Sequence, residues 1–249
     1  MSDTPQALPP AERTVGQLVA ETIRLYGRRF LLCLPLGLPA AVLDVVAAQA
    51  PRTTGFWVAL TAGPALLTLS YVGATLVALD ASRAPRRLAL AYAAGVLVFV
   101  PFPLLATLFI LPGLAWLALF GLVVPAILVE GRGFRDGLNR ATRLARADYV
   151  HALGSLAALA LVYFVSRFGL AVLLRGQGEQ TEAVAAFLAD VVIAPLLFLG
   201  TALLYVDQAA RVVDSGRPTT KRPRRASRAD LHPADHAHGA GRPDAQVEP

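Results

Sequence analysis

Three ionisable residues lie within long apolar stretches of the sequence: Asp44, Arg167 and Asp190. A charge at the centre of a membrane helix costs about 2.5 to 3.5 kcal/mol, so such residues are the first candidates for a functional site. If the three lie at a similar depth, as the helical rise predicts, the arginine is neutralised by one or two carboxylates. Two alternatives stay open: a functional polar cluster that contacts an ion or an anionic head group, and an ion pair that fixes helix packing, with Arg167 also able to snorkel outward.

A basic segment between two apolar runs is the second candidate, and its arginines are Arg135, Arg140, Arg143 and Arg146. Apolar residues recur between them at helical spacing: Phe134, Leu138, Ala141, Ala145 and Tyr149. The pattern predicts that the apolar side faces the acyl boundary while the arginines approach anionic phosphates, each contributing about 1 kcal/mol. Positive charge that only sets topology is the alternative, and the two do not exclude each other.

The remaining polar features indicate no cofactor and no catalysis. Residues 221–225 are basic, and His232, His236 and His238 are near the end of the chain, but they lie in a stretch too polar to form a packed core. No phosphate-cradling glycine loop, HExxH or GxSxG motif is present. We therefore expect no enzyme, no metal, no cofactor and no nucleic-acid partner.

Composition then shows what must position these residues. Of 249 residues, 55% are hydrophobic and 16% charged, with a mean hydropathy of +0.55, so a bilayer has to cover part of the surface. The predicted fold is an all-α, polytopic transmembrane helical bundle with proline-kinked spans and amphipathic interfacial helices. The spans are expected at residues 30–48, 56–79, 88–111, 114–129, 151–174 and 183–206, and the interfacial helices at 14–29 and 133–149. These form a membrane domain over 13–213, between a disordered 1–12 and a disordered, basic, cytoplasmic tail at 214–249.

The apolar run from Leu88 to Val129 requires a turn. As one helix it would be roughly 63 Å long, twice a hydrocarbon core of about 30 Å. The segment Leu111-Pro112-Gly113 is the predicted break, because glycine supplies a turn conformation and proline cannot continue the hydrogen-bond ladder.

Charge sets the expected orientation. Of the 23 basic residues, only Arg52 and Arg175 fall in loops of the side opposite the N-terminus, and Arg167 lies within a span. The positive-inside rule therefore places both termini in the cytoplasm. Only Lys221 among the basic residues is lysine, which indicates a GC-rich bacterial coding sequence and thus a bacterial plasma membrane.

The two basic segments share a register. Pairing Val15 with Phe134 also pairs Val19 with Leu138 and Arg24-Leu25 with Arg143-Leu144. A parallel repeat of an interfacial helix and the span after it would explain this, and so would convergence of two helices at a membrane edge.

Several motifs resemble one family of bacterial integral membrane proteins. They are Leu111-Pro112-Gly113, Val124-Pro125-Ala126, Val129-Glu130-Gly131-Arg132-Gly133, a helix with Arg140 and Arg143-Leu144, Thr14-Val15-Gly16 to Arg24-Leu25-Tyr26, and Pro195-Leu196 to Leu204-Tyr205-Val206-Asp207. This order is similar to proteins related to the membrane domain of glycerophosphoryl diester phosphodiesterase, over residues 13 to 213. It departs at Ala141-Thr142, where a serine is expected after the arginine.

The resemblance implies a standalone six-helix membrane domain without phosphodiesterase activity, because catalysis in those enzymes belongs to a separate soluble barrel domain that this sequence lacks. We therefore expect a non-enzymatic, lipid-contacting or accessory membrane module, with membrane lipids and their anionic head groups as partners and a protein partner left open. The alternative is a small-solute or lipid transporter with its site at Asp44, Arg167 and Asp190. An intramembrane enzyme ranks third, because no nucleophile and base can be named.

Overall fold

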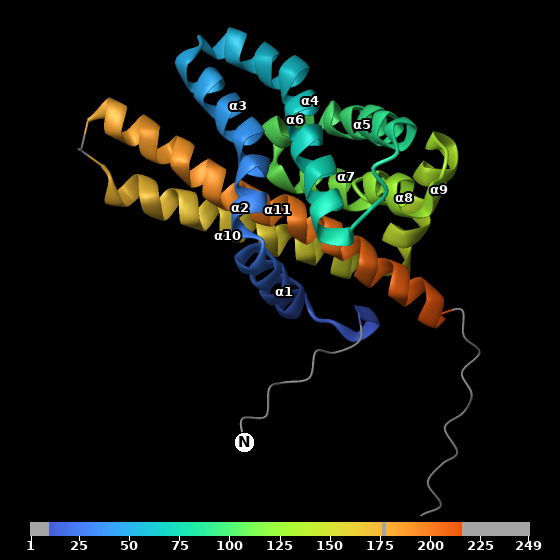
Figure 1. Cartoon of the computed structure of the whole chain (residues 1–249). Coiled ribbons are helices and arrows are strands. Elements are labelled where there is room, and N and C mark those ends of the chain that lie inside the picture. Colours follow the sequence, from blue (N-terminus) through green and yellow to red (C-terminus); the bar gives the residue numbers. More distant parts are fainter. Residues whose placement is uncertain (1–9, 176–177, 216–249) are drawn as a thin grey trace, which may run out of the picture. The chain divides into compact units, whose positions relative to one another are not determined.

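Helices form all the regular structure of the described part of the chain, which is residues 10–175 and 178–215 of a computed structural model. The longer helices are α1 (Val15–Arg28), α3 (Leu38–Gln49), α4 (Arg52–Leu79), α5 (Pro85–Phe99), α7 (Ile110–Phe120), α9 (Phe134–Ala147), α10 (Tyr149–Leu173) and α11 (Glu179–Ser215). The shorter ones are η1 (Pro10–Glu12), α2 (Phe30–Cys33), η2 (Leu34–Gly37), α6 (Pro101–Leu108) and α8 (Val123–Glu130). The predicted all-α bundle is confirmed (Figure 1).

Six segments are long and apolar enough to cross a membrane, which is the number predicted. They are Phe30–Gln49, Arg52–Leu79, Pro85–Ala106, Ile110–Glu130, Tyr149–Leu173 and Gln180–Asp214. The chain is therefore a multi-pass membrane protein by helix length and composition. Of the two ends predicted to be disordered, Pro10–Glu12 form a 3-10 turn and α11 continues to Ser215, while the rest lies outside the described residues.

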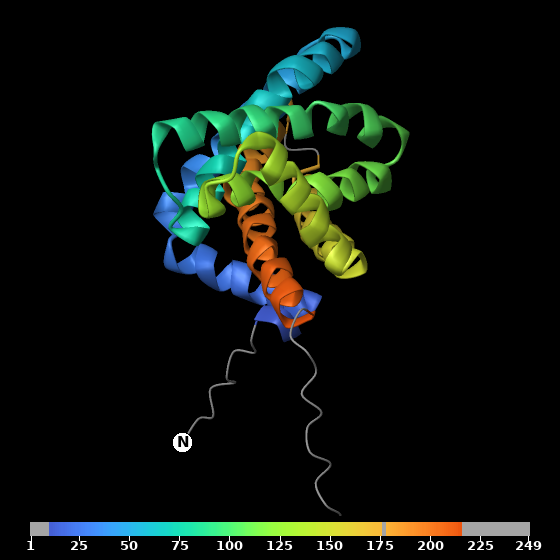
Figure 2. The ribbon, with the colours of Figure 1, turned by 90° about the vertical axis from the view of Figure 1, so that its right-hand side faces the viewer.

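The turn in the long apolar run comes earlier than predicted. Phe109, with extended backbone at φ −161° and ψ 150°, separates α6 from α7, and Leu111-Pro112-Gly113 lie inside the first turn of α7. A proline costs little there, because the first four N–H groups of a helix have no partner within it. In Figure 2, α5 and α6 follow one another across the view before the chain folds back as α7.

Most of the other prolines also mark helix starts and not kinks. Pro35 lies in η2, Pro101 begins α6, and Pro125 lies in the first turn of α8. Among the described helices, only α4 and α11 contain a proline beyond their first turn, Pro64 and Pro195.

Two hairpins organise the bundle. Helix α3 packs along α4, and α10 packs along α11, while α11 also contacts α3 and α4 (Figure 1). Arg29 secures the first hairpin at its open end, because its guanidinium donates to the Val77 carbonyl at 2.6 Å and lies 3.5 Å from the Asp80 carboxylate. A cation at the C-terminus of α4 is favourable, since the last carbonyls of a helix carry partial negative charge.

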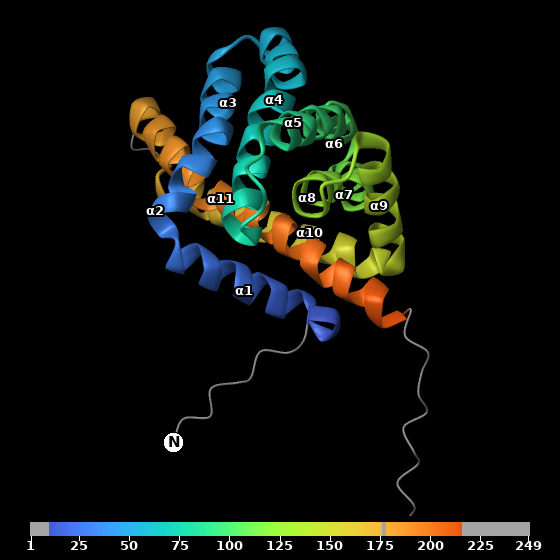
Figure 3. The same cartoon turned by 45° about the vertical axis from the view of Figure 1, so that its right-hand side comes forward.

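The two amphipathic helices, α1 and α9, have the same length, and their buried positions keep the register seen in the sequence. Each has 14 residues; Leu18, Thr22 and Tyr26 are buried in α1, and their counterparts Gly137, Ala141 and Ala145 are buried in α9. Thr14 caps α1 through a capping box with Gln17, as its position predicts. The neighbours differ, however: α1 contacts α10 and α11, whereas α9 contacts α7, α8 and α11 (Figure 3). The likeness is local, and the packing around the two helices is not repeated.

The backbone of α11 just before Pro195 is contacted from two sides. Pro195 has no N–H, so the Val191 carbonyl one turn earlier loses its helical donor. Gly37 of η2 approaches this carbonyl so closely that a Cβ there would lie 2.3 Å from the oxygen. Tyr26 of α1 donates its hydroxyl to the next carbonyl, Val192, at 2.8 Å. This part of α11 is therefore one of the places at which the N-terminal helices contact it.

The close approach at Gly37 predicts a steric effect of a single methyl group. We expect Gly37→Ala to lower the free energy of unfolding by about 1 to 3 kcal/mol, because the backbone of α11 has to move away. The matched control is Gly169→Ala on α10, where nothing lies within 4 Å of the added methyl group. That change should be neutral or slightly stabilising, since alanine favours a helix over glycine. Thermal midpoints in detergent measure both, and equal midpoints would contradict the packing described here.

Candidate functional site

Asp44, Arg167 and Asp190 come together, one from each of α3, α10 and α11. The Arg167 guanidinium donates to Asp44 at 2.7 Å and to both carboxylate oxygens of Asp190 at 3.0 Å. Tyr163, one turn before Arg167, completes what we call the Arg167 cluster: its hydroxyl donates to Asp190 at 2.7 Å and accepts from Arg167 at 3.1 Å. The arginine thus bridges two carboxylates, Asp44 and Asp190, that are 146 positions apart in the chain.

The Arg167 cluster carries one negative charge when both carboxylates are ionised. The Asp190 side chain is fully buried, whereas those of Arg167 and Asp44 are 27% and 38% exposed. Buried charges are tolerated when they are paired and their remaining lone pairs are hydrogen-bonded, which the Tyr163 hydroxyl provides for Asp190. The cluster therefore has the chemistry of a satisfied ion pair with one more carboxylate than cation.

Two cavities flank the cluster. The first, about 200 Å³, lies between α10 and α11 and extends from Arg167 to Leu174 and Glu182 near the hairpin end. The second, also about 200 Å³, lies in the middle of the bundle and is reached by Tyr163. Arg167 lines one and Tyr163 the other, so the cluster separates a partly polar cavity from an apolar one.

The central cavity is almost wholly apolar. Its lining comes from α3, α4, α5, α6, α7, α10 and α11 and includes Phe99, Leu114, Leu156 and Phe198. Protein interiors are closely packed, so an apolar cavity of this size, lined by side chains from several helices, is a candidate binding site.

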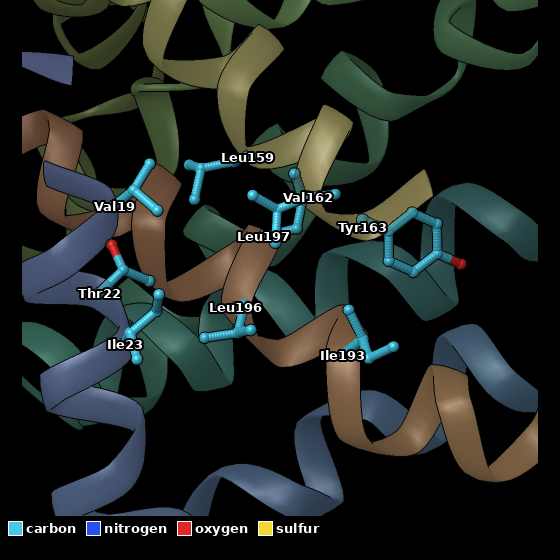
Figure 4. A pocket seen from close by; sticks show the side chains of 9 residues that line it. All are labelled: Val19, Thr22, Ile23, Leu159, Val162, Tyr163, Ile193, Leu196 and Leu197. Carbon is cyan, nitrogen blue, oxygen red and sulfur yellow. The ribbon is translucent and has the colours of Figure 1, made fainter. Parts of the chain in front are cut away.

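A smaller pocket lies where α1 crosses the second hairpin. Its lining includes Val19, Thr22 and Ile23 of α1, and its volume is only about 10 Å³ (Figure 4). Tyr163 borders it too, but in Figure 4 its hydroxyl points away from the α1 side chains. The pocket is too small for a ligand and is a packing gap between α1 and the second hairpin.

At the other end of the bundle, Glu130 gathers a second set of partners that the sequence did not predict. Its carboxylate accepts from Arg140 at 2.8 Å, from the Tyr205 hydroxyl at 2.6 Å, and from Arg132. The hydrogen bond to Glu130 raises the pKa of the Arg132 guanidinium. This Glu130 cluster ties α8 and α9 to α11.

A third cluster ties the ends of the membrane domain together. Arg211 of α11 binds the Asp148 carboxylate at 2.8 Å and the Arg13 carbonyl at 2.8 Å. Arg13 in turn binds the buried Asp207 at 3.1 Å. We call this the Asp148 cluster; it joins the start of α1, the junction of α9 and α10, and the end of α11.

The arginines predicted to contact lipid divide into two groups. Arg135, Arg143 and Arg146 are exposed, whereas the Arg140 side chain is only 17% exposed and pairs with Glu130. The opposite side of α9, predicted to face acyl chains, is partly covered by the protein: Ala141 and Ala145 are fully buried, whereas Phe134 is 36% exposed. Helical spacing indicates that an apolar face exists, but not whether lipid or protein covers it.

The functional candidates that sequence reasoning missed are Tyr163, Glu130 and Tyr205. Tyr163 lies four residues before Arg167, which places both on one face of α10, so this spacing was a usable signal. Glu130 and Tyr205 lie 75 positions apart, so spacing along one helix could not pair them.

Comparison of the chain with protein-family models, with characterised proteins and with solved structures gives no match. The class of the protein, a multi-pass helical membrane protein, therefore rests on its six apolar segments and their packing.

The Arg167 cluster predicts that the arginine stabilises the fold. We expect Arg167→Leu to lower the free energy of unfolding by about 3 to 5 kcal/mol, because Asp190 is left buried without a cation. Adding Asp190→Asn should recover part of the loss by removing the buried charge. Arg175→Leu, at an exposed position after α10, is the matched control and should be nearly neutral. Chemical unfolding in detergent gives the values, and an Arg167→Leu effect no larger than the control would refute the prediction.

Proposed function

We propose that the chain is a non-enzymatic, lipid-contacting module of a bacterial plasma membrane, in which the free arginines of α9 bind anionic head groups. The observation that supports this proposal best is that α9 has one side packed against the protein and one exposed, basic side. Its apolar side is partly buried against other helices, while Arg135, Arg143 and Arg146 are exposed and pair with no carboxylate in residues 10–175 and 178–215. Unpaired arginines at a membrane edge attract anionic lipids.

The surface around these arginines supports a head-group contact. An open depression on α9 is lined by Arg132, Asp136, Asn139, Thr142 and Arg143. Two guanidinium groups and an asparagine amide can donate to phosphate oxygens there, and one carboxylate, Asp136, opposes them. Arginine suits this role because its planar fork matches a phosphate.

The proposed orientation puts α9 on the cytoplasmic side, together with both termini. Arg83, Arg86 and Arg87 in and after the loop that follows α4 are exposed, and so is Arg24 of α1. Basic residues concentrated on one side of a membrane protein favour the cytoplasmic side. The sequence resemblance to the membrane domain of glycerophosphoryl diester phosphodiesterase is compatible with this proposal and supports a non-catalytic module.

Transport is a second candidate function, and the partly polar cavity beside the Arg167 cluster favours it. This cavity joins Arg167 to Glu182, near the turn between α10 and α11. A small cationic solute would match the excess negative charge of the cluster. Flux across proteoliposomes that is lost in Asp190→Asn would support transport, and absence of flux would leave the cluster as a packing element.

The lipid proposal predicts different outcomes for arginines one turn apart. Neutralising Arg135, Arg143 and Arg146 together to glutamine should weaken binding of short-chain phosphatidylglycerol on the order of a hundredfold, from about 1 kcal/mol each. Arg140→Gln is the matched control; it should reduce stability through Glu130 and leave affinity nearly unchanged. Titration of the detergent-solubilised protein measures both, with phosphatidylcholine as the neutral lipid. Equal affinities for the triple variant and the unchanged protein would contradict the proposal.

The orientation predicts which loops a membrane-impermeant thiol reagent can reach in intact cells. Cys33 is the one cysteine of the chain and is buried, so Cys33→Ala gives a background without thiols. In that background Thr53→Cys, at the exposed start of the second span, should react from outside. Ser82→Cys, in the loop after α4, should react only once the membrane is permeabilised. The reverse pattern would place the termini on the opposite side.

A further inference from the structure

The central apolar cavity opens sideways to the surface that the spans present to the bilayer. Of the side chains lining it, Ile110 at the start of α7 and Phe164 on α10 are exposed, by 40% and 47%. These two residues therefore mark where the lining of the cavity reaches the surface of the bundle. The surface beyond Phe164 is apolar as well, because Leu161 and Phe168 on α10 are 63% and 72% exposed. In a membrane, this opening faces lipid chains.

The hydroxyl groups that line the cavity already donate hydrogen bonds within the protein, so none is available to a polar ligand. Three lining side chains carry hydroxyls, and each donates within the protein: Tyr71 to the Gly121 carbonyl at 2.9 Å, Thr201 to the Leu197 carbonyl at 2.8 Å, and Tyr163 to Asp190 at 2.7 Å. A polar solute would lose its hydrogen bonds to water without replacement. Water is disfavoured for the same reason, since apolar cavities of comparable size stay dry.

We propose that this cavity binds one acyl chain of a membrane lipid, which enters between Ile110 and Phe164. A hydrocarbon chain needs no hydrogen bond, and it fills volume that the side chains leave unfilled. The opening lies within two membrane-spanning segments, where acyl chains are the surrounding solvent. The proposal rests on the membrane location in the proposed function but not on the α9 arginines, so either can fail without the other.

Small lining residues determine how much of an acyl chain the cavity can hold. Ala160 of α10 and Ala194 of α11 are small, buried lining residues, and Phe198 lies one turn further along α11. Leucine at Ala160 would place four carbon atoms where one stands now and fill part of the cavity. Small residues between helices that enclose a cavity are therefore the determinants of its capacity.

The test places a tryptophan at the buried wall of the cavity and asks whether a lipid chain reaches it. The full-length chain has two tryptophans, so Trp57→Phe and Trp116→Phe provide a background without tryptophan. Phe198→Trp is then added, at a lining position only 5% exposed. In vesicles of phosphatidylcholine with brominated acyl chains, its fluorescence should be quenched about as strongly as that of Phe168→Trp, which faces the bilayer. Phe99→Trp, 7% exposed and also lining the cavity, serves if Phe198→Trp does not fold.

Filling the cavity gives the matched comparison. Adding Ala160→Leu to the Phe198→Trp protein should remove most of the quenching, whereas Ala93→Leu, at an exposed position of α5, should not change it. Quenching of Phe168→Trp without quenching of Phe198→Trp or Phe99→Trp would overturn the acyl-chain site alone. Quenching that survives Ala160→Leu would also overturn it. Absence of quenching at Phe168→Trp would contradict the membrane location and with it both proposals.

Discussion

The packing of this bundle depends on pairing charged side chains that lie away from water. Arg167 lies in an apolar stretch where an isolated cation is costly, and its partners come from helices far apart in the chain. Asp44 and Asp190 can reach it only if α3 packs beside the hairpin of α10 and α11. That packing in turn requires a glycine at position 37, next to the carbonyl left free by Pro195. The pairing of the buried charges and the close backbone contact at Gly37 thus require the same arrangement of helices.

The charged clusters are ion-paired, whereas the lining of the central cavity is almost wholly apolar. Tyr163 belongs to both regions, because its hydroxyl binds Asp190 while the residue also lines the central cavity. Lipid therefore has two different contacts in our proposals: a head group at the exposed arginines of α9 and an acyl chain inside the bundle. These contacts lie on different helices and depend on different forces, one electrostatic and the other hydrophobic.

Hydropathy and helical rise predicted the six spans and the common depth of Asp44, Arg167 and Asp190, because both depend on length along one helix. They could not predict which helix covers which face. The apolar side of α9 was assigned to lipid, yet it is partly buried by α7, α8 and α11, since periodicity describes a helix and not its neighbour. The contact of Glu130 with Tyr205 was missed for a similar reason: it joins segments 75 positions apart. The break at Phe109 was displaced because a proline is as acceptable inside the first turn of a helix as before it.

Helix α11 is fixed near both of its ends, and this limits how the protein can move. Asp190 binds Arg167 near the start of α11, and Asp207 binds Arg13 about 25 Å further along, by the rise of 1.5 Å per residue. Sliding α11 by one helical turn, about 5.4 Å, would break both ion pairs at once. Axial movement of α11 is therefore costly, and the two ion pairs fix its position along the bundle.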